Sequence, residues 1–482
     1  MTSSPAAVSS ASRAELLRRI DRFPRWGLTA ASVLTISLGM LFVQYDIFNI
    51  NVSFVQTCLQ IVDGCSPTNS DAFIGLPVFM SLVGYGIGAL LLGPLSDRFG
   101  RHSMLIVSMV ITGLGSLYSM LSFDEAHFVL SRLITGIGVG ADLAIINVFV
   151  SEVSPRRLRG KYTSLLFIMA AFGSALGIWL GLWLTTPMGD WPSGLPFALA
   201  SESFDSGWRW VYGIGAVLAV VSLFLRISLP ESPRWLADRG RLDEAAAVIS
   251  RMEALATRRA PLLPADANPV AIPEPSTSTW GAIRELFRSP FYLRRLAVLG
   301  AAWGLGYLTI YAFSGAFTSV LVRQGYTPGE AGMVSAVGLL GFIAAAFAIR
   351  SVVDRLERKL WMMVGGGIAV VGALLVAFGG ESPLIVFAGA IILFFGQNLW
   401  VPAQYALTAE SFPTRFRTTA YALADSIGHV GGGLGVFLLV GALGQLPLQA
   451  TMLGLVAFLV LGSFVNLLAV NTRGKNLEEI SQ

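Results

Sequence analysis

Long apolar runs of about 20 residues recur along the chain, and short polar joints separate them. An α-helix needs about 20 apolar residues to cross the hydrocarbon core of a bilayer, so each run predicts one membrane-spanning helix. The chain has twelve such runs, six before and six after a longer polar stretch. We place them at about 27–55, 73–95, 103–122, 127–150, 162–185 and 208–229, and at about 296–318, 331–349, 360–379, 384–408, 419–442 and 449–470.

These runs predict an all-α membrane protein in five parts. The parts are an N-terminal tail (1–26), a first six-helix bundle (27–229), a linker with short surface helices (230–295), a second six-helix bundle (296–470) and a C-terminal tail (471–482). The N-terminal tail is rich in Ser, Ala and then Arg, and no small-residue cleavage site follows it. We therefore expect no cleaved signal peptide.

Basic residues are distributed very unequally between the two sides of these helices. If both termini face the cytoplasm, 30 of the 33 Lys and Arg residues lie in cytoplasmic segments, and only Arg209 and Arg323 lie outside. Since positive charge is retained on the cytoplasmic side, both termini are predicted to be cytoplasmic. Only three of the 33 Lys and Arg residues are Lys. Such an excess of Arg over Lys is typical of GC-rich bacterial genomes. We expect a multi-pass protein of the plasma membrane, which in a bacterium is the inner membrane.

Composition excludes several classes of protein. Hydrophobic residues make up 54% of the 482 residues and charged residues 13%, about half the charged fraction of soluble proteins. This argues against a water-soluble enzyme, and the net charge of +4 forms no basic face for nucleic acid. No Cys/His cluster has metal-ligand spacing, so we expect no metal and no cofactor. Cys58 and Cys65 lie in the first outer joint, where a disulfide and two free thiols are both compatible with the sequence.

Two polar joints of the first half reappear in the second half. Segment 93–102 aligns with 350–359 at an offset of 257 residues, and 151–160 aligns with 409–418 at an offset of 258. The chain is therefore predicted to be a duplicated six-helix unit, with its halves related about an axis along the membrane normal.

The same joints carry charges that we expect to form a cytoplasmic gate. The predicted gate residues are Gly93, Asp97, Arg98, Gly100, Arg101, Glu152, Arg159, Asp354, Arg355, Arg358, Glu410 and Arg417, with Glu231 and Arg234 of the linker. Asp97 is expected to cap a neighbouring helix N-terminus. We expect Glu152, Glu410 and Glu231 to pair with Arg101, Arg358 and Arg159, and opening toward the cytoplasm to break these contacts. The alternative is that the charges only fix the topology.

Several motifs resemble the sugar-porter branch of the major facilitator superfamily. They are GPLSDRFGR after the second helix, SRLITGIGVG in the fourth, GWRWVYG at the start of the sixth, PESPRWL after it and TRGKNLEEI near the C-terminus. The resemblance implies two pseudo-symmetric six-helix bundles that transport a metabolite with protons by alternating access. The glutamine pattern of the family's seventh helix is replaced here by WGLGYLTIYAF, so the resemblance does not fix a hexose as the solute.

Five ionisable residues lie well within the apolar runs: Asp46, Arg132, Asp142, Asp425 and His429. Each costs roughly 2.5–3.5 kcal/mol or more at a helix centre unless it is paired or hydrated, so their presence indicates function. In sugar porters the Asp of a matching YD element pairs with the Arg of the fourth helix and exchanges a proton. The resemblance implies this role for Asp46 and Arg132, and the alternative is a fixed ion pair between two helices.

Other polar side chains within the runs are candidates for substrate binding. These candidates are Asn49, Asp142, Tyr307, Tyr311, Gln397, Asn398, Gln404, Tyr405, Asp425 and His429. Gln397 and Gln404 are seven residues apart and are predicted to share a helix face. Asp425 and His429 are four residues apart and form either a second proton site or a static pair. For the others, hydrogen bonding or packing between helices is the structural alternative.

These features predict proton-driven uptake of a small polar organic solute such as a sugar, a polyol or an organic acid. An organic-anion or phosphate symporter is an alternative, in which Arg132 or a protonated His429 binds the anion. A proton-independent facilitator and a solute receptor without transport are two others. No nucleophile, base and orienting residue occur together, so we expect no enzyme. We expect a monomer whose partners are solute, protons and lipid.

Overall fold

The computed structural model describes residues 12–155, 158–201, 203–258, 260–264, 279–353, 355–380, 382–413 and 417–473. Within these ranges the regular structure is helical, and no strand is longer than an isolated bridge. Apolar runs rich in Leu, Ala, Val and Ile form the helices because a helix satisfies all of its backbone hydrogen bonds internally.

Twelve helical segments of the described chain are long and apolar enough to cross a membrane, as predicted. In the first half they are α2 (Ala30–Phe48) with α3 (Ile50–Ile61), α4 (Ser70–Phe73) with α5 (Gly75–Ile87), η2 (Gly88–Leu92) and α6 (Gly93–Phe99), then α7 (Arg101–Leu121), α8 (Glu125–Val153), α9 (Arg159–Thr185) and α10 (Gly207–Arg226). In the second half they are α14 (Pro290–Gly315) with α15 (Phe317–Arg323), α16 (Pro328–Val352), α17 (Leu360–Phe378), α18 (Pro383–Leu399) with α19 (Val401–Glu410), α20 (Arg417–Leu443) and α21 (Leu448–Asn466). The second span begins with the short helix η1 (Pro67–Asn69). Four short helices of the described chain lie outside the spans: α1 (Arg13–Asp21), α11 (Pro233–Asp238), α12 (Leu242–Ala256) and α13 (Thr279–Arg288).

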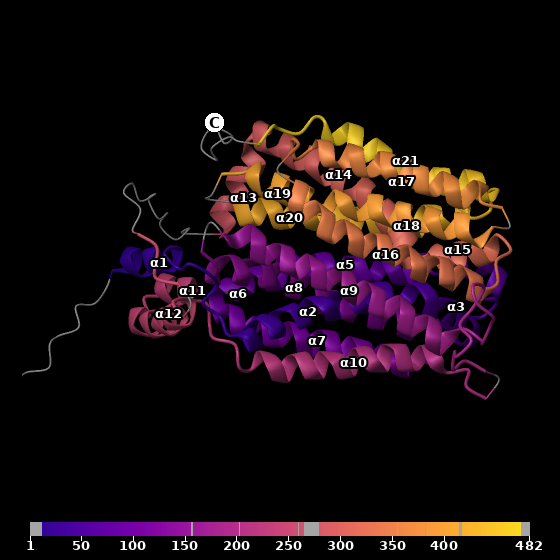
Figure 1. Cartoon of the computed structure of the whole chain (residues 1–482), viewed down its shortest axis with the longest axis horizontal. Coiled ribbons are helices and arrows are strands. Elements are labelled where there is room, and N and C mark those ends of the chain that lie inside the picture. Colours follow the sequence, from indigo (N-terminus) through magenta and orange to yellow (C-terminus); the bar gives the residue numbers. More distant parts are fainter. Residues whose placement is uncertain are drawn as a thin grey trace, which may run out of the picture.

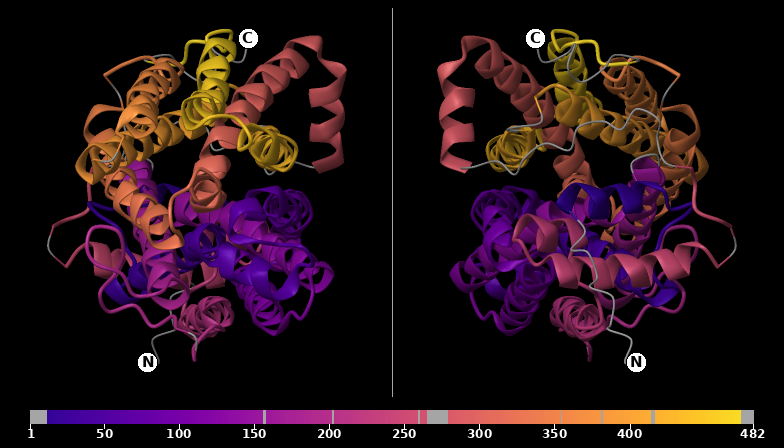
Figure 2. Two further views of the ribbon diagram at one scale, coloured as in Figure 1. Left: turned by 90° about the vertical axis from the view of Figure 1, so that its right-hand side faces the viewer. Right: turned by 90° about the vertical axis from the view of Figure 1, so that its left-hand side faces the viewer.

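The spanning helices form two groups that follow the two halves of the sequence (Figures 1 and 2). In the first half α8 packs against α5 and α7, and in the second half α14 packs against α20 and α21. The halves meet mainly where α5 contacts α20 and where α9 contacts α16. We call the end of the molecule that carries α1, α11 and α12 the linker end (Figure 1). The opposite end carries a disulfide between Cys58 and Cys65, and we call it the disulfide end.

Three of the predicted continuous helices are interrupted. The first is interrupted at Asn49, the seventh at Ala316 and the tenth at Trp400. Pro402 at the start of α19 explains the break at Trp400, because proline has no backbone N–H to donate to the preceding turn. The second helix contains the π-helical turn η2, a distortion that is frequent at functional sites.

Glycines allow several helices to approach very closely. Gly84 of α5 and Gly88 of η2 lie against α8, and Gly136 and Gly140 of α8 lie against α5. A Cβ atom at Gly140 would lie 2.0 Å from the carbonyl oxygen of Tyr85. Such contacts between small residues drive helix association in membranes, where lipid is as apolar as the side chains.

Gly173, Gly177 and Gly181 recur at every fourth residue, and this spacing predicts a second close helix contact. Gly173, Gly177 and Gly181 of α9 all face α2 and α3, and a Cβ at Gly173 would lie 2.0 Å from the carbonyl oxygen of Leu41. This prediction is confirmed.

Gly140→Leu is expected to lower stability by ~1–3 kcal/mol or more, because the added side chain meets backbone atoms that cannot rotate away. The measurement is the apparent melting temperature of the purified protein. Gly367→Leu is a matched control, because Gly367 is also in a spanning helix and a Cβ there meets nothing within 4 Å. Equal melting temperatures for the two variants would contradict this account of the α5–α8 contact.

Two linker helices, α11 and α12, pack on the first half at the linker end, whereas α13 contacts α14 and α20 of the second half (Figure 2). Ile20 of α1 and Ile249 of α12 are both fully buried in one apolar cluster. Arg19 of α1 also pairs with Glu253 of α12 at 2.6 Å. The predicted short linker helices are therefore present, and the N-terminal helix α1 joins them.

Candidate functional site

A cavity of about 1010 Å³ lies between the two halves. Its lining residues run from the middle of the spanning helices, at Tyr311 of α14, to the linker end, at Arg98 of α6 and Arg239 after α11. The cavity is therefore accessible from the linker end. In a membrane-spanning protein, a cavity that opens at one end is accessible from one side of the membrane.

Contacts between the halves close the disulfide end. The amide of Asn51 in α3 donates to the carbonyl oxygen of Phe313 at 2.9 Å, and its oxygen accepts from the Thr318 hydroxyl at 2.6 Å. These contacts lie on either side of the break in α14 and α15. Arg323 of α15 pairs with the buried Asp71 of α4 at 3.1 Å. Each contact joins the first half to the second.

Six of the ten predicted substrate residues line the cavity: Tyr307, Tyr311, Asn398, Tyr405, Asp425 and His429. The Tyr307 and Tyr405 hydroxyls are 2.7 Å apart, and Asn398 donates to the carbonyl oxygen of Phe342 at 2.9 Å. Lining residues that the sequence analysis missed include Gln44, Tyr85 and Tyr421. Tyr85 lies in an apolar run and only the docking of α5 against α20 reveals its role in the cavity wall.

The other four predicted substrate residues lie away from the cavity. Gln404 is turned toward α21, where it exchanges two hydrogen bonds with Asn466 at 2.8 and 3.0 Å. Gln397 and Asn49 are buried, and their side-chain amides have no hydrogen-bond partner among the described residues. Neither Gln397 nor Gln404 lines the cavity, contrary to their prediction as substrate residues, and the helix that was expected to carry both on one face breaks at Trp400 between them.

Asp142 is the fourth of these residues, and its placement on the cavity wall was also wrong. It is fully buried in α8 and pairs with Arg226 of α10 through both carboxylate oxygens; the distance from Oδ2 to the guanidinium is 2.9 Å. The Ser108 hydroxyl donates to Asp142 Oδ1 at 2.7 Å, and Arg226 also donates to the carbonyl oxygen of Leu105 at 2.9 Å. Arg226 was counted with the basic linker, so this pair was missed.

The predicted contact between Asp46 and Arg132 is present. Asp46 Oδ2 accepts from the Arg132 guanidinium at 3.0 Å, and the same guanidinium donates to the Asp46 carbonyl oxygen at 3.0 Å. Ser116 of α7 donates to Asp46 Oδ1 at 3.1 Å. The ring of Tyr212 lies 5.5 Å from the guanidinium carbon. Both charges are buried, with exposed side-chain fractions of 3% and 1%, and neither lines the cavity.

Charged residues of the first half form a network at the linker end. Arg101 pairs with Asp97 at 2.6 Å and with Glu152 at 3.0 Å. Glu231 of the linker accepts from the backbone N–H of Arg101 at 2.9 Å. Arg234 donates to the carbonyl oxygen of Glu152 at 3.0 Å. Asp97 thus pairs with Arg101, and the expectation that it caps a neighbouring helix is not met among the described residues.

Two glycines of the first joint have distinct places. Gly93 lines the cavity, and Gly100 has a φ of +100° that favours glycine. A Cβ at Gly100 would lie 2.2 Å from Glu231. Arg98, on the cavity rim, lies over the ring of Phe99 at 5.3 Å.

In the second half Arg358 pairs with Glu410 at 3.7 Å, and Arg355 is exposed. Asp354 and the side chains of Arg159 and Arg417 lie outside the described residues. The pairs Arg101 with Glu152 and Arg358 with Glu410 each lie within one half and are present while the cavity opens at this end. These two pairs are therefore intact in a conformation that is open at the linker end.

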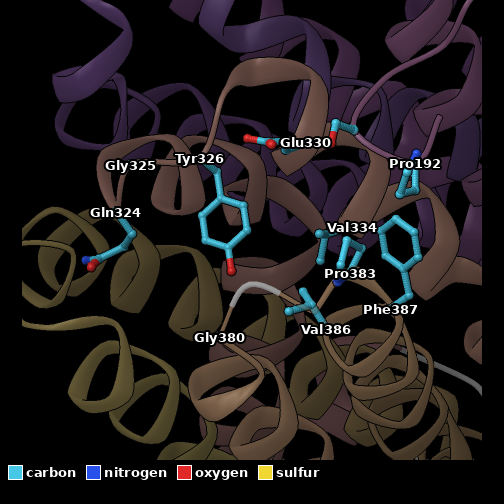
Figure 3. Close-up of a pocket in the computed structure, with 11 residues that line it drawn as sticks. Pro192, Gln324, Gly325, Tyr326, Glu330, Val334, Gly380, Pro383, Val386 and Phe387 are labelled. Carbon is cyan, nitrogen blue, oxygen red and sulfur yellow. The ribbon is translucent and has the colours of Figure 1, made fainter. Parts of the chain in front are cut away.

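A smaller cavity of about 310 Å³ lies at the disulfide end (Figure 3). Glu330 and Tyr326 are its titratable lining side chains. The Glu330 carboxylate caps α16 by accepting from the N–H and hydroxyl of Thr327 at 2.9 and 3.0 Å. The carboxylate that lines this cavity is therefore engaged in the cap of α16.

Comparison with known proteins identifies the family to which this chain belongs. The profile described as sugar (and other) transporter matches residues 32–482. The chain belongs to the sugar transporter family. A glucose transporter of Staphylococcus epidermidis is 28% identical over 92% of this chain and 94% of its own. An arabinose-proton symporter of Bacillus subtilis is 24% identical over 85% and 86%.

Among solved structures, the xylose transporter XylE of E. coli in a partially occluded inward-open conformation superposes with a TM-score of 0.70. The two proteins are 21% identical, and the match covers 92% of this chain and 99% of the other. The fold is thus that of the major facilitator superfamily, as the motifs implied. This family member is a multi-pass membrane transporter and not an enzyme, in agreement with both expectations.

Proposed function

We propose that this sugar transporter family member is a proton-coupled symporter that takes up a small polar organic solute by alternating access. The observation that carries the proposal is the buried Asp46–Arg132 ion pair beside a cavity between the two halves. The names of its relatives support it: a glucose transporter, a D-xylose transporter and an arabinose-proton symporter.

The proposed coupling uses the opposite effects of burial and of a guanidinium on a carboxyl group. Burial favours the protonated form, and a cation within about 4–6 Å favours the charged form. In the present conformation, open at the linker end, Asp46 accepts a hydrogen bond from Arg132. We propose that Asp46 takes a proton when the cavity opens at the disulfide end and releases it when the cavity opens at the linker end.

We propose that the linker end faces the cytoplasm, because nearly all the basic residues lie in the segments at that end. The cavity then faces inward, and the contacts of Asn51 and Arg323 close the outer side. We further propose that the protein acts as a monomer.

The organic-anion alternative is not favoured. It required Arg132 or a protonated His429 as the anion site, but Arg132 is paired with Asp46 and does not line the cavity. Uptake into proteoliposomes tests the proposal against a facilitator and a receptor. Glucose, xylose and arabinose are offered with and without an inward proton gradient. We expect accumulation only with the gradient; a facilitator equilibrates without it, and a receptor binds without uptake.

Asp97→Asn is expected to reduce transport by at least an order of magnitude with little loss of membrane insertion. Asp97 lies on the cavity rim, 60% of its side chain is exposed, and it pairs with Arg101. The amide loses this charge pair and any contact that Asp97 makes when the rim closes. The measurement is initial uptake normalised to inserted protein. A wild-type rate would exclude a gating role, and Asp205→Asn, at an exposed loop position, serves as the control.

A further inference from the structure

The middle of the central cavity is lined by few ionisable side chains. Apart from tyrosines, its ionisable lining residues at this depth are Asp425 and His429, both on α20. The other charged lining residues lie on α6, at the ends of α7 and α8, or in the linker, so they belong to the cavity rim. A solute that reaches the middle of the membrane therefore meets one carboxyl group and no Arg or Lys.

The Asp425 carboxyl group has one oxygen in use and one without a hydrogen bond. Oδ2 accepts from the Tyr85 hydroxyl of the other half at 2.8 Å. Oδ1 is buried, lies 3.4 Å from His429 Nδ1 and accepts no hydrogen bond from the described residues. His429 Nδ1 is closer to the Asp425 carbonyl oxygen, at 2.8 Å. A neutral imidazole with its proton on Nδ1 satisfies this bond, and Asp425 is then the one acidic group other than the tyrosines at this depth of the described cavity wall.

Aromatic rings lie around His429, the neighbour of this carboxyl group. Tyr85 stacks on His429 with ring centroids 3.7 Å apart, and the tilted rings of Tyr307 and Tyr311 lie 4.2 and 5.8 Å from it. Tyr405 joins Tyr307 through their hydroxyls. The negative face of an aromatic ring attracts a cation, most strongly when the site is shielded from water, and such cages recognise quaternary ammonium groups.

The cavity is poorly equipped to recognise a neutral polyol. Amides are well suited to reading hydroxyl groups, yet Gln397 and Gln404 lie away from the cavity. Asn398 and Asn147 line it, but their NH2 groups donate to the carbonyl oxygens of Phe342 and Leu143. Gln44 is the remaining amide on the wall.

We propose that the central cavity binds an organic cation, with the Asp425 carboxylate as its counterion and the rings of Tyr85, Tyr307 and Tyr311 as its wall. This inference rests on the proposed function in one respect: it takes the bound organic cation to be the transported solute. Binding at the site does not require proton coupling.

Binding to the purified full-length protein in nanodiscs tests this site. The probes are choline, tetraethylammonium and benzyltrimethylammonium, with 3,3-dimethylbutan-1-ol as the uncharged isostere of choline, and xylose, arabinose and glucose as neutral solutes. Thermal stabilisation and calorimetry are measured at constant ionic strength. We expect at least one cation to bind the wild-type protein at least tenfold more tightly than the uncharged isostere and the sugars.

Asp425→Asn is expected to weaken binding of that cation at least tenfold, whereas Asp205→Asn, a carboxylate outside the cavity, leaves it unchanged. If Asp425→Asn does not fold, the comparison of choline with its uncharged isostere on the wild-type protein still tests the proposal. The proposal is overturned if none of the three cations binds, if the uncharged probes bind as well as the cations, or if Asp425→Asn binds the cation like the wild type.

The two proposals fail separately. If a cation binds but does not accumulate under a proton gradient, symport fails and the cation site stands. If a sugar accumulates and no cation binds, symport stands and the cation site fails.

Discussion

The Asp46→Asn variant is expected to lose uphill accumulation of solute completely and to retain exchange of labelled for unlabelled solute. The amide of the same size keeps one acceptor oxygen, which can accept from Ser116, and the Arg132 guanidinium can still donate to the backbone carbonyl oxygen of residue 46, so we expect the helices to remain packed. It cannot take up or release a proton, so the proton gradient no longer drives transport. Accumulation and counterflow, both measured in proteoliposomes, separate the two activities.

Asp205→Asn, an exposed loop carboxylate, should preserve both activities and controls for the chemical change itself. If Asp46→Asn accumulates solute to the wild-type ratio under a pH gradient, the pair is a fixed link between α2 and α8. Loss of exchange together with accumulation would indicate that the substitution damages the structure, and the melting temperature of the variant tests that directly.

Asp142→Ala is expected to destabilise the protein by about 3–5 kcal/mol, because it leaves the buried Arg226 guanidinium without its counterion. Arg226 is fully buried, and its remaining polar contact among those described is the carbonyl oxygen of Leu105. The measurement is the free energy of unfolding in a denaturant titration. A loss below about 1 kcal/mol, the size of an exposed ion pair, would contradict the buried-pair account.

The double variant Asp142→Leu with Arg226→Met is expected to recover most of this stability, since removing both charges removes the unpaired charge. It also decides between the two roles that the sequence left open for Asp142. If the double variant accumulates solute like the wild type, the pair is structural. If it is stable but does not accumulate solute, the pair takes part in coupling.

The sequence predicted the twelve helices and one of the two buried ion pairs in the first half. The resemblance to sugar porters implied the pairing of Asp46 with Arg132, and in the structure the two side chains are 3.0 Å apart. Arg226 could not be matched with Asp142 from the sequence. Arg226 is the last residue of its helix, next to the basic linker, so its charge was attributed to the excess of basic residues that sets the membrane topology.

Helix breaks limited the prediction of the cavity wall. Periodicity assigns faces only within a regular helix, and the break at Trp400 separates Gln397 from Gln404. Pro402 was a signal for that break that periodicity ignored. Tyr85 contributes to the wall through the docking of α5 on α20, a contact between halves that no local pattern encodes.

The most direct test of the central claim is to record proton movement with solute entry. Purified protein is reconstituted in vesicles that contain a pH-sensitive dye, and glucose, xylose, arabinose and choline are added outside in turn. Coupling through Asp46 predicts that the transported compound acidifies the vesicle interior with the wild type and causes no pH change with Asp46→Asn. Entry of labelled solute through the wild-type protein without acidification would contradict the claim.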